Sequence, residues 1–550
     1  MRSTQAVGVM AKRFREGYND TQLTGGSRGD SEPPDRRSNI HVTLGREPIM
    51  TSSIPNQKVS AWRVLMRTMR VLLLALVILV GLPVLAWWIV GLVLRSQGRQ
   101  ELHSVLVELE QKDPAWTWER LQVDRPAVPA EQNFFEMIQR IARQVRPVGQ
   151  IPRTLHSQEH AWQEYRQSVP PNHRWLPQAV TVVRRDFQTL PEALTLLRSL
   201  KKYPQGSVQI TLDANPLATR LEFLDHWATL STLLDLESQL AIQEGDFPRA
   251  VGHIQTFFQS SRLFGETPVL IGHLVALSSH RMGLKTVEQW LAHDTAAEQL
   301  DQVQRWIEQD NSHLTSDLAW RAERAAINEL FTALENGSVT LEELLSHDIP
   351  NGDWYLYQWL RWTYWYRVPR DRATYLRWMS RWLEEVMSRP VEERLAAAKA
   401  FEQSLQSDLQ VPAAPVTFVM LRYITSTRVM VSQVQAVALN RCAQVAVACE
   451  RFRQKHQRWP KQLDELTPEF LAQLPVDPFT GQPLLMTQTA NGLVIHSPVQ
   501  QLKGLRRPEH PREAAGLPEG VLVGFRLWNP EHRRQPPLPT QLQLPEGGND

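Results

Sequence analysis

Cysteine is nearly absent from this chain, and its scarcity limits the chemistry that the protein can perform. Cys442 and Cys449 are the only two cysteines in 550 residues. Seven positions along one helix would separate their Cα atoms by ~10.5 Å, and a disulfide needs them within ~7 Å. Two thiols cannot complete a zinc site without other ligands. We therefore expect two buried apolar thiols and neither a disulfide nor a cysteine-based metal centre.

Strong net charge is also absent, as are the common catalytic signatures. The formal net charge is +2, whereas a dedicated nucleic-acid-binding protein carries a concentrated basic face. The sequence contains no Walker loop, no dinucleotide fingerprint and no Cys–His nucleophile arrangement. From the sequence we therefore predict no nucleic-acid partner, no cofactor, no catalytic residue and no resident metal.

A long uncharged apolar run is present, from Val71 to Leu94, between Arg70 and Arg95. As a helix it would reach ~36 Å, enough to cross a ~30 Å hydrocarbon core. The run continues past Ala86, the small residue after which a signal peptide could be cleaved. We therefore predict an uncleaved transmembrane helix at 71–94, with a cleaved signal peptide and a buried soluble helix as the alternatives.

Basic residues concentrate before this run, and no acidic residue lies between Met50 and Val71. The basic residues are Lys58, Arg63, Arg67 and Arg70. The positive-inside rule then predicts that residues 1–70 form a disordered basic tail in the cytoplasm. The large C-terminal part would lie outside the cytoplasmic membrane of a bacterium. Met50 is an alternative start to Met1, in which case residues 1–49 are an over-extended start.

The remaining sequence predicts a mainly α fold with a small C-terminal α+β module. Prolines interrupt residues 95–180 at short intervals, so we predict a proline-rich region there that connects the transmembrane helix to the helical body. Residues 181–410 place apolar side chains at helical spacing, which predicts a body of helical hairpins or a helical bundle. Residues 411–528 combine a long helix with three short strands, and residues 529–550 form a proline-rich tail that we expect to be disordered.

A helical hairpin is expected at about Leu234–Phe264, where Gly245-Asp246-Phe247 turns the chain. The small, turn and aromatic positions are Ala241, Gly245, Phe247 and Ala250. At these positions the stretch resembles a tetratricopeptide unit. The resemblance implies stacked hairpins with a groove for a peptide or protein, and a plain bundle is the alternative. Thr267-Pro268 is expected to cap and begin the next helix, which would run to about Leu291.

The C-terminal module is expected to begin with a long helix from Val416 toward Lys455, followed by Trp459-Pro460 and a short leucine-containing helix. A turn then follows at Asp477-Pro478-Phe479-Thr480-Gly481-Gln482-Pro483. Strands are expected at Leu484–Thr487, Leu493–His496 and Val521–Trp528, the first two joined through Asn491-Gly492. Between Val434 and Thr487 this order resembles the G-type pseudopilin of type II secretion. The resemblance implies a long helix packed on a three-stranded antiparallel sheet.

One motif matches a metal-site pattern. His156-Ser157-Gln158-Glu159-His160 has the form H-x-x-E-H, in which two histidines on one helix face could hold zinc while Glu159 activates water. Glu237 lies at a separation comparable with the third ligand of the zinc peptidase family that this stretch resembles. The chain holds 16 histidines and 58 acidic residues, so chance matches are common. We favour an exposed polar helix here.

Aromatic residues gather between Asp353 and Trp382 in two stripes at helical spacing. The first consists of Tyr355, Trp359, Trp362 and Tyr366, and the second, beyond Pro369, of Trp378, Met379, Trp382 and Leu383. If exposed, such a stripe could stack on sugars or bases or lie on a membrane. Aromatic stripes at this spacing more often face a core, so we predict that both are buried.

Together these patterns predict a single-pass, membrane-anchored envelope protein. Its extracytoplasmic helical domain would bind or scaffold another protein or a peptide. One alternative is a component of a secretion or pilus-like system, as the pseudopilin resemblance implies. The other is a zinc peptidase that uses His156, Glu159, His160 and Glu237.

Overall fold

The computed structural model describes residues 58–123, 125–145, 160–294, 298–309, 311–345, 354–408, 414–499, 517–518 and 520–538. Residues 1–57, which include both alternative starts and most of the predicted cytoplasmic tail, lie outside the described part, as do residues 539–550. The chain divides into two compact units, Met1–Val90 and Gly91–Asp550. We call them the N-terminal unit and the C-terminal unit.

The described part of the N-terminal unit is helical and apolar. Helix α2 (Lys58–Leu76) passes through a π-helical stretch (Val77–Gly81) into α3 (Leu82–Lys112). The π stretch directly precedes Pro83, which cannot donate a backbone hydrogen bond to the preceding turn, so local widening of the helix accommodates it. Within the described residues, Leu65–Lys112 is the one helix that is long and apolar enough to cross a membrane, judged by length and composition.

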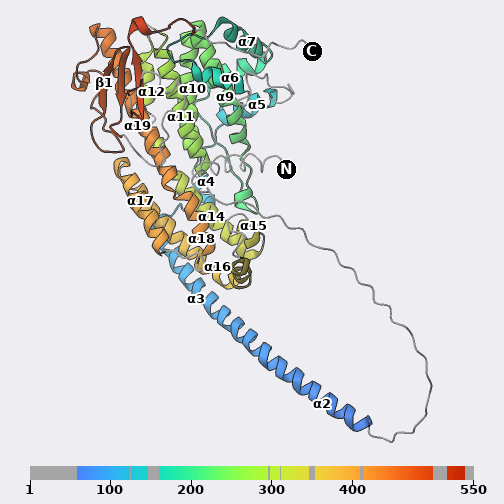
Figure 1. Cartoon of the computed structure of the whole chain (residues 1–550). Helices are drawn as coiled ribbons and strands as arrows, with labels where there is room; N and C mark the ends of the chain where they lie inside the picture. The colour runs from blue at the N-terminus through green and yellow to red at the C-terminus, as the bar shows by residue number, and fades with distance from the viewer. Residues whose placement is uncertain are drawn as a thin grey trace, which may run out of the picture. The chain divides into compact units, whose positions relative to one another are not determined.

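The C-terminal unit is built mainly from helices (Figure 1). They are α4 (Trp118–Val123), α5 (Phe134–Val145), α6 (His160–Ser168), α7 (Pro177–Gln188), α8 (Pro191–Ser199), α9 (Glu222–Glu244), α10 (Phe247–Gly265), α11 (Leu270–Leu291), α12 (Leu300–Gln309), α13 (Asn311–Leu314), α14 (Leu318–Asn336), α15 (Leu341–Leu345), α16 (Trp354–Trp382), α17 (Val391–Asp408), α18 (Pro415–Ile424) and α19 (Thr427–His456). A π-helical stretch, Leu383–Met387, follows α16 directly. The prediction of a mainly α fold is confirmed.

The expected hairpin is present as α9 and α10. Gly245 ends α9 in the left-handed conformation at φ +80°, which glycine adopts without steric cost. The Asp246 side chain then accepts a hydrogen bond from the backbone N–H of Arg249 at the start of α10. Local turn chemistry therefore fixes this hairpin.

The expected start of the next helix was two residues too early. Helix α11 begins at Leu270, after Val269 in an extended conformation. Instead of capping α11, the Thr267 hydroxyl donates a hydrogen bond back to the Leu263 carbonyl, at 3.0 Å. Thr267 therefore bonds to the last turn of α10, which ends two residues earlier at Gly265. The predicted end of the helix at Leu291 is confirmed.

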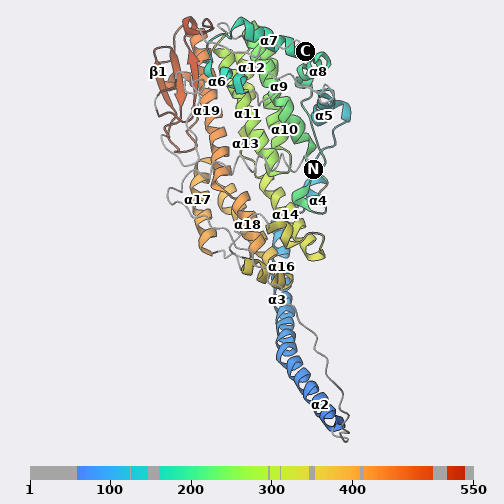
Figure 2. The same ribbon diagram turned by 45° about the vertical axis from the view of Figure 1, so that its right-hand side comes forward.

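The sheet contains β1 (Leu485–Thr489), β2 (Gly492–His496) and β3 (Gly524–Trp528), antiparallel in the order β1-β2-β3. Thr489 pairs with Gly492, so Ala490 and Asn491 form the turn, one residue earlier than expected. Figures 1 and 2 both show α19 beside this sheet. The prediction of a long helix on a small antiparallel sheet is confirmed.

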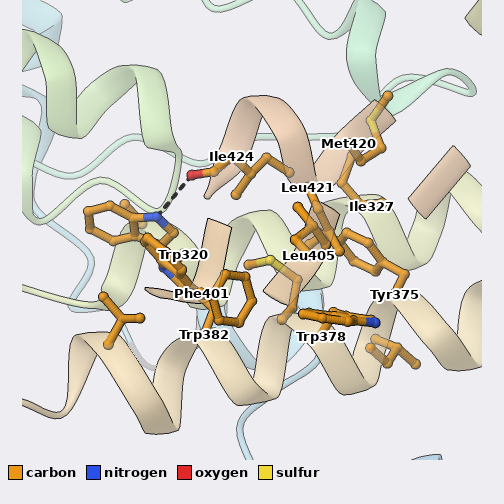
Figure 3. Close-up of a cluster of buried hydrophobic side chains, with 14 of the residues drawn as sticks. Trp320, Ile327, Tyr375, Trp378, Trp382, Phe401, Leu405, Met420, Leu421 and Ile424 are labelled. Carbon is orange, nitrogen blue, oxygen red and sulfur yellow. Dashed lines mark hydrogen bonds between the residues drawn. The ribbon is translucent and has the colours of Figure 1, made fainter. Parts of the chain in front are cut away.

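The sheet shares its hydrophobic core with the helical body. A single cluster of buried side chains joins residues of α9–α12, α19, β2 and β3, among them Ile254, Trp290, Ile307, Cys449 and Phe525, and Met486 of β1 packs against it. A second cluster joins α3, α14 and α16–α19, and Figure 3 shows part of it. Helix α19 contributes to both clusters, so it connects the sheet to α14 and α16–α18.

Candidate functional site

The predicted zinc-binding residues are only partly described. His156 and Glu159 lie outside the described residues, and His160 is the first residue of α6. Glu237 is fully buried on α9. Its Oε1 accepts a hydrogen bond from Arg198 Nε at 2.7 Å, and its Oε2 lies 2.9 Å from His253 Nε2. Both carboxylate oxygens are therefore engaged by α8 and α10.

Electrostatics favour an ionised Glu237 in this position. Burial alone would raise its pKa, but His253, Arg249 and Arg198 together hold the pKa of Glu237 below its ordinary value. A buried carboxylate paired in this way fixes helices to one another. Glu237, the third ligand that the peptidase resemblance implies, is thus already bound by side chains of the fold itself. Within the described residues, no group of three or more His, Cys, Asp or Glu side chains is placed to hold a metal ion.

Three buried histidines, which the sequence analysis did not identify, lie between α11, α13 and α19. His280 Nε2 lies 2.8 Å from Asn440 Oδ1, and Ser261 Oγ lies 2.8 Å from His313 Nε2. Burial lowers the pKa of His273 and His280 to about 4 and that of His313 to about 2. These rings are therefore neutral near pH 7. The seven-residue spacing of His273 and His280 places both on one face of α11, and this spacing could have identified the cluster from the sequence.

The Ser–His pair in this cluster does not form an accessible nucleophile. Ser261 is fully buried, and its Oγ also lies 2.9 Å from the Ala276 carbonyl oxygen.

The two cysteines are buried, as predicted: Cys442 and Cys449 are both fully buried. Burial raises the pKa of both thiols above its ordinary value, which makes them unreactive.

The aromatic helix α16 is different, because part of its aromatic surface is open. Trp359 and Trp362 are 42% and 69% exposed, while Tyr366 on the same stripe is buried. The prediction that the first stripe is buried is wrong for these two tryptophans. The side chain of Tyr355 lies outside the described residues. The second stripe is buried as predicted at Trp378, Met379 and Trp382, and Leu383 is partly buried. Figure 3 shows Trp378 and Trp382 in the core.

The reason lies in how far α16 extends. Helix α16 is continuous through Pro369, so both aromatic stripes begin on one helix. From Thr363 onward α16 contributes side chains to the core, whereas Trp359 and Trp362, just before that point, are exposed. Helical spacing identified the stripe correctly but could not show where its packing partners end.

Asp371 fixes the middle of α16 to α18. It is fully buried, and it accepts hydrogen bonds from the Tyr364 hydroxyl at 2.8 Å and from the backbone N–H groups of Val416 and Thr417 at 3.1 and 3.2 Å. These N–H groups belong to the first turn of α18, where the helix itself offers no acceptor. Burial raises the pKa of Asp371 to about 6 even with these donors. The hydrogen bonds of Asp371 therefore fix α16 to α18 just after the segment that carries Trp359 and Trp362.

Two glycines let α16 approach α3 closely. A Cβ atom at Gly91 would lie 2.8 Å from the Trp365 ring, and one at Gly98 would lie 3.1 Å from the Arg370 backbone nitrogen. The seven-residue spacing puts both glycines on one face of α3. Farther along, Lys112 pairs with Glu384 at 3.1 Å. We call this contact between α3 and α16 the glycine seam.

Gly98→Leu should open the glycine seam and lower the free energy of unfolding of the C-terminal unit by ~1–3 kcal/mol, because the new side chain would overlap the α16 backbone. Gln97→Leu is the matched control, since residue 97 is exposed on the same helix. Thermal unfolding of the full chain in detergent would measure both. Equal melting temperatures for the two variants would contradict the close packing of this seam.

Comparison with known proteins gives no family assignment, because no family model, no curated protein and no solved structure matches this chain. The functional argument therefore rests on the chain's own residues. Among the described residues after Leu94, Trp359 and Trp362 of α16 are the exposed tryptophans, and core packing does not explain them.

Proposed function

We propose that this chain is a single-pass membrane protein whose C-terminal unit lies outside the cytoplasm and binds or scaffolds another protein or a peptide. The observation that carries the proposal is the continuity of α3. This helix contains the second half of the apolar run, and its later turns bury Leu102, Val105 and Leu109 in the core of the C-terminal unit. A helix that supplies part of a folded core supports a retained anchor better than a segment that is cleaved away.

The stacked helices α9, α10 and α11 support the binding part of the proposal. Stacked helical hairpins offer extended surfaces that other proteins use to hold peptides, and α9–α10 is the hairpin that resembles a tetratricopeptide unit. The buried carboxylates of Glu237 and Asp371 and the hydroxyl of Ser261 are hydrogen-bonded within the fold. Such pairing suits a rigid scaffold.

A component of a secretion or pilus-like system is the second candidate. The observation that favours it is the order of α19, the turn at Asp477 and the three strands, which is the order that the pseudopilin resemblance implies. In the turn, Asp477 Oδ2 accepts hydrogen bonds from the backbone N–H and the hydroxyl of Thr480, at 3.0 and 2.8 Å. In this case the partner would dock on the sheet rather than on α9–α11.

Topology is tested by fusing alkaline phosphatase after Asp550 in the full chain. We expect the fusion to stay in the membrane after a carbonate wash and to be active, because the basic residues before Val71 favour a cytoplasmic N-terminus. Replacing Lys58, Arg63, Arg67 and Arg70 by alanine is the control and should reduce that activity. Release by carbonate would refute the anchor, and an inactive phosphatase with an active cytoplasmic reporter would refute the orientation.

Partner binding is tested by photo-crosslinking in cells, with the crosslinker at one exposed position at a time. Ala228 on α9 and Ser278 on α11 sample the stacked helices, and Gln488 on β1 samples the sheet. We expect one discrete adduct from Ala228 or Ser278 and none from Gln488. An adduct from Gln488 alone would favour the second candidate, and no adduct from any of the three would contradict both.

A further inference from the structure

We propose that the N-terminal half of α16 rests in the lipid–water interface of the membrane that anchors the chain, with Trp359 and Trp362 in contact with lipid. This inference rests on the proposed function, because it needs the apolar run to be a membrane span. It adds a second membrane contact, made by a segment more than 250 positions later in the sequence.

The first step is the direction of α16 relative to α3. Contacts advance in the same direction along both helices: Gly91 meets Trp365 and Tyr366, Gly98 meets Pro369 and Arg370, and Lys112 meets Glu384. The two helices are therefore parallel. Figures 1 and 2 both show α16 at the end of the C-terminal unit where α3 enters it, and β1 at the opposite end.

The second step is the position of the exposed rings along α16. Gly91 is itself part of the uncharged run, so Tyr366 lies at the edge of that run. Trp362 and Trp359 precede Tyr366 by four and seven residues, which correspond to ~6 and ~10.5 Å along a helix axis. Because the two helices are parallel, both tryptophans precede Tyr366 in the direction of the N-terminal end of α3. Both rings therefore lie within about two helical turns of the level of Gly91, close to the predicted end of the span.

The third step is the chemistry of the exposed surface. Tryptophan prefers the membrane interface because its ring is apolar and its N–H is polar. The Arg367 guanidinium lies over the Trp359 ring at 4.1 Å and 5.6 Å from the centre of the Tyr366 ring, and the Arg95 guanidinium lies 5.8 Å from the centre of the Trp365 ring. Long arginine side chains can keep their charge at the headgroups while their stems cover apolar surface.

The charge at this end of the C-terminal unit points to anionic lipid. Arg95, Arg99, Arg367 and Arg370 gather around the seam, and the Arg370 side chain is 70% exposed. Glu101 is the acid that faces Arg370, at 3.5 Å. Basic side chains next to exposed aromatic rings are the pattern of membrane-surface segments. A sugar or a peptide could also stack on two tryptophans, but neither accounts for the packing of the same helix against Gly91, which is part of the uncharged run.

The test uses single cysteines introduced into the full chain and labelled with an environment-sensitive fluorophore. Cys442 and Cys449 are fully buried, so the label reports only on the introduced position. Trp359→Cys and Trp362→Cys are compared with Leu485→Cys on β1, where the native side chain is 46% exposed. Each protein is reconstituted into vesicles of phosphatidylcholine and phosphatidylglycerol that contain a lipid with a spin label near its headgroup.

We expect blue-shifted emission and several-fold stronger quenching by the spin-labelled lipid at positions 359 and 362 than at 485, with the reverse order for aqueous iodide. Quenching at 359 and 362 should increase with the phosphatidylglycerol content. Equal iodide quenching at all three positions would overturn the inference. So would a blue shift that occurs in cell membranes but not in lipid-only vesicles, because a protein would then cover the tryptophans.

The same vesicles distinguish a failure of the lipid contact from a failure of the predicted membrane anchor. If carbonate releases the chain, the anchor itself is wrong. If the chain is retained and positions 359 and 362 stay open to iodide, the anchor stands and only the lipid contact of α16 fails. Unchanged thermal unfolding of the labelled variants would show that they are folded, as expected for replacements at exposed positions.

Discussion

Replacing Glu450 by glutamine should destabilise the C-terminal unit by ~3–5 kcal/mol, because it would leave the Arg533 guanidinium buried without its counter-charge. Both side chains are fully buried. Arg533 Nη1 and Nη2 donate to the two Glu450 oxygens at 3.0 and 2.7 Å. The same guanidinium also donates to the Trp528 and Asp294 carbonyls. One side chain thus connects α19, the end of β3 and the loop after α11.

The matched control is Glu469→Gln, which breaks the solvent-exposed pair with Lys455 on the same helix. Surface ion pairs contribute ~0–1 kcal/mol, so its unfolding midpoint in urea should barely move. Similar midpoints for the two variants would contradict the view that the buried pair holds the sheet to α19.

The same pair predicts a pH dependence. Burial would raise the pKa of Glu450, but Arg453 and Arg533 together hold it below its ordinary value. Because the folded state lowers this pKa, the carboxylate adds stability above the unfolded pKa of ~4.3, and that stability is lost as the pH falls through the folded pKa. The urea midpoint of the native protein should therefore fall more steeply below pH ~4.3 than that of Glu450→Gln.

Local patterns in the sequence predicted the features that local chemistry determines. The apolar run from Val71 to Leu94 contains no charge, so a helix there was expected. Gly245 marks the left-handed end of α9, and Asn491 marks the hairpin turn. In each case the residues that decide the structure are neighbours in sequence.

Long-range pairs could not be predicted in this way. Arg526 on β3 forms a buried ion pair with Glu288 on α11 at 2.6 Å, across 238 positions. Nothing near either residue indicates its partner, because the pair exists only once the sheet packs on the helical body. The sequence therefore predicted the helix and sheet of the C-terminal module but not the core that they share with α9–α12.

The candidate site shows the same limit. The spacing of Trp359, Trp362 and Tyr366 showed that they share a face of one helix, and Gly91 and Gly98 are spaced for a close helix contact. Which part of that face the body covers depends on where α16 meets α3 and α18. The aromatic surface was therefore visible in the sequence, and its exposure was not.

Trp382→Ala should lower the free energy of unfolding by ~3–5 kcal/mol, whereas Trp362→Ala on the same helix should leave it nearly unchanged. Trp382 is fully buried, and its ring meets Phe401 edge to face at a centroid distance of 5.1 Å (Figure 3). Truncation there leaves a cavity that the surrounding helices cannot fill. Trp362 loses little packing when it is truncated, because its side chain is mostly outside the core.

Urea unfolding of both variants in one detergent measures this difference, and the comparison is matched because each change removes one indole from α16. Equal destabilisation would mean that Trp362 is packed as tightly as Trp382, which would remove the surface that the lipid contact requires. We expect a large loss of unfolding free energy for Trp382→Ala alone. That result would show that the part of α16 around Trp382 stabilises the fold, while the surface around Trp362 is free to contact lipid.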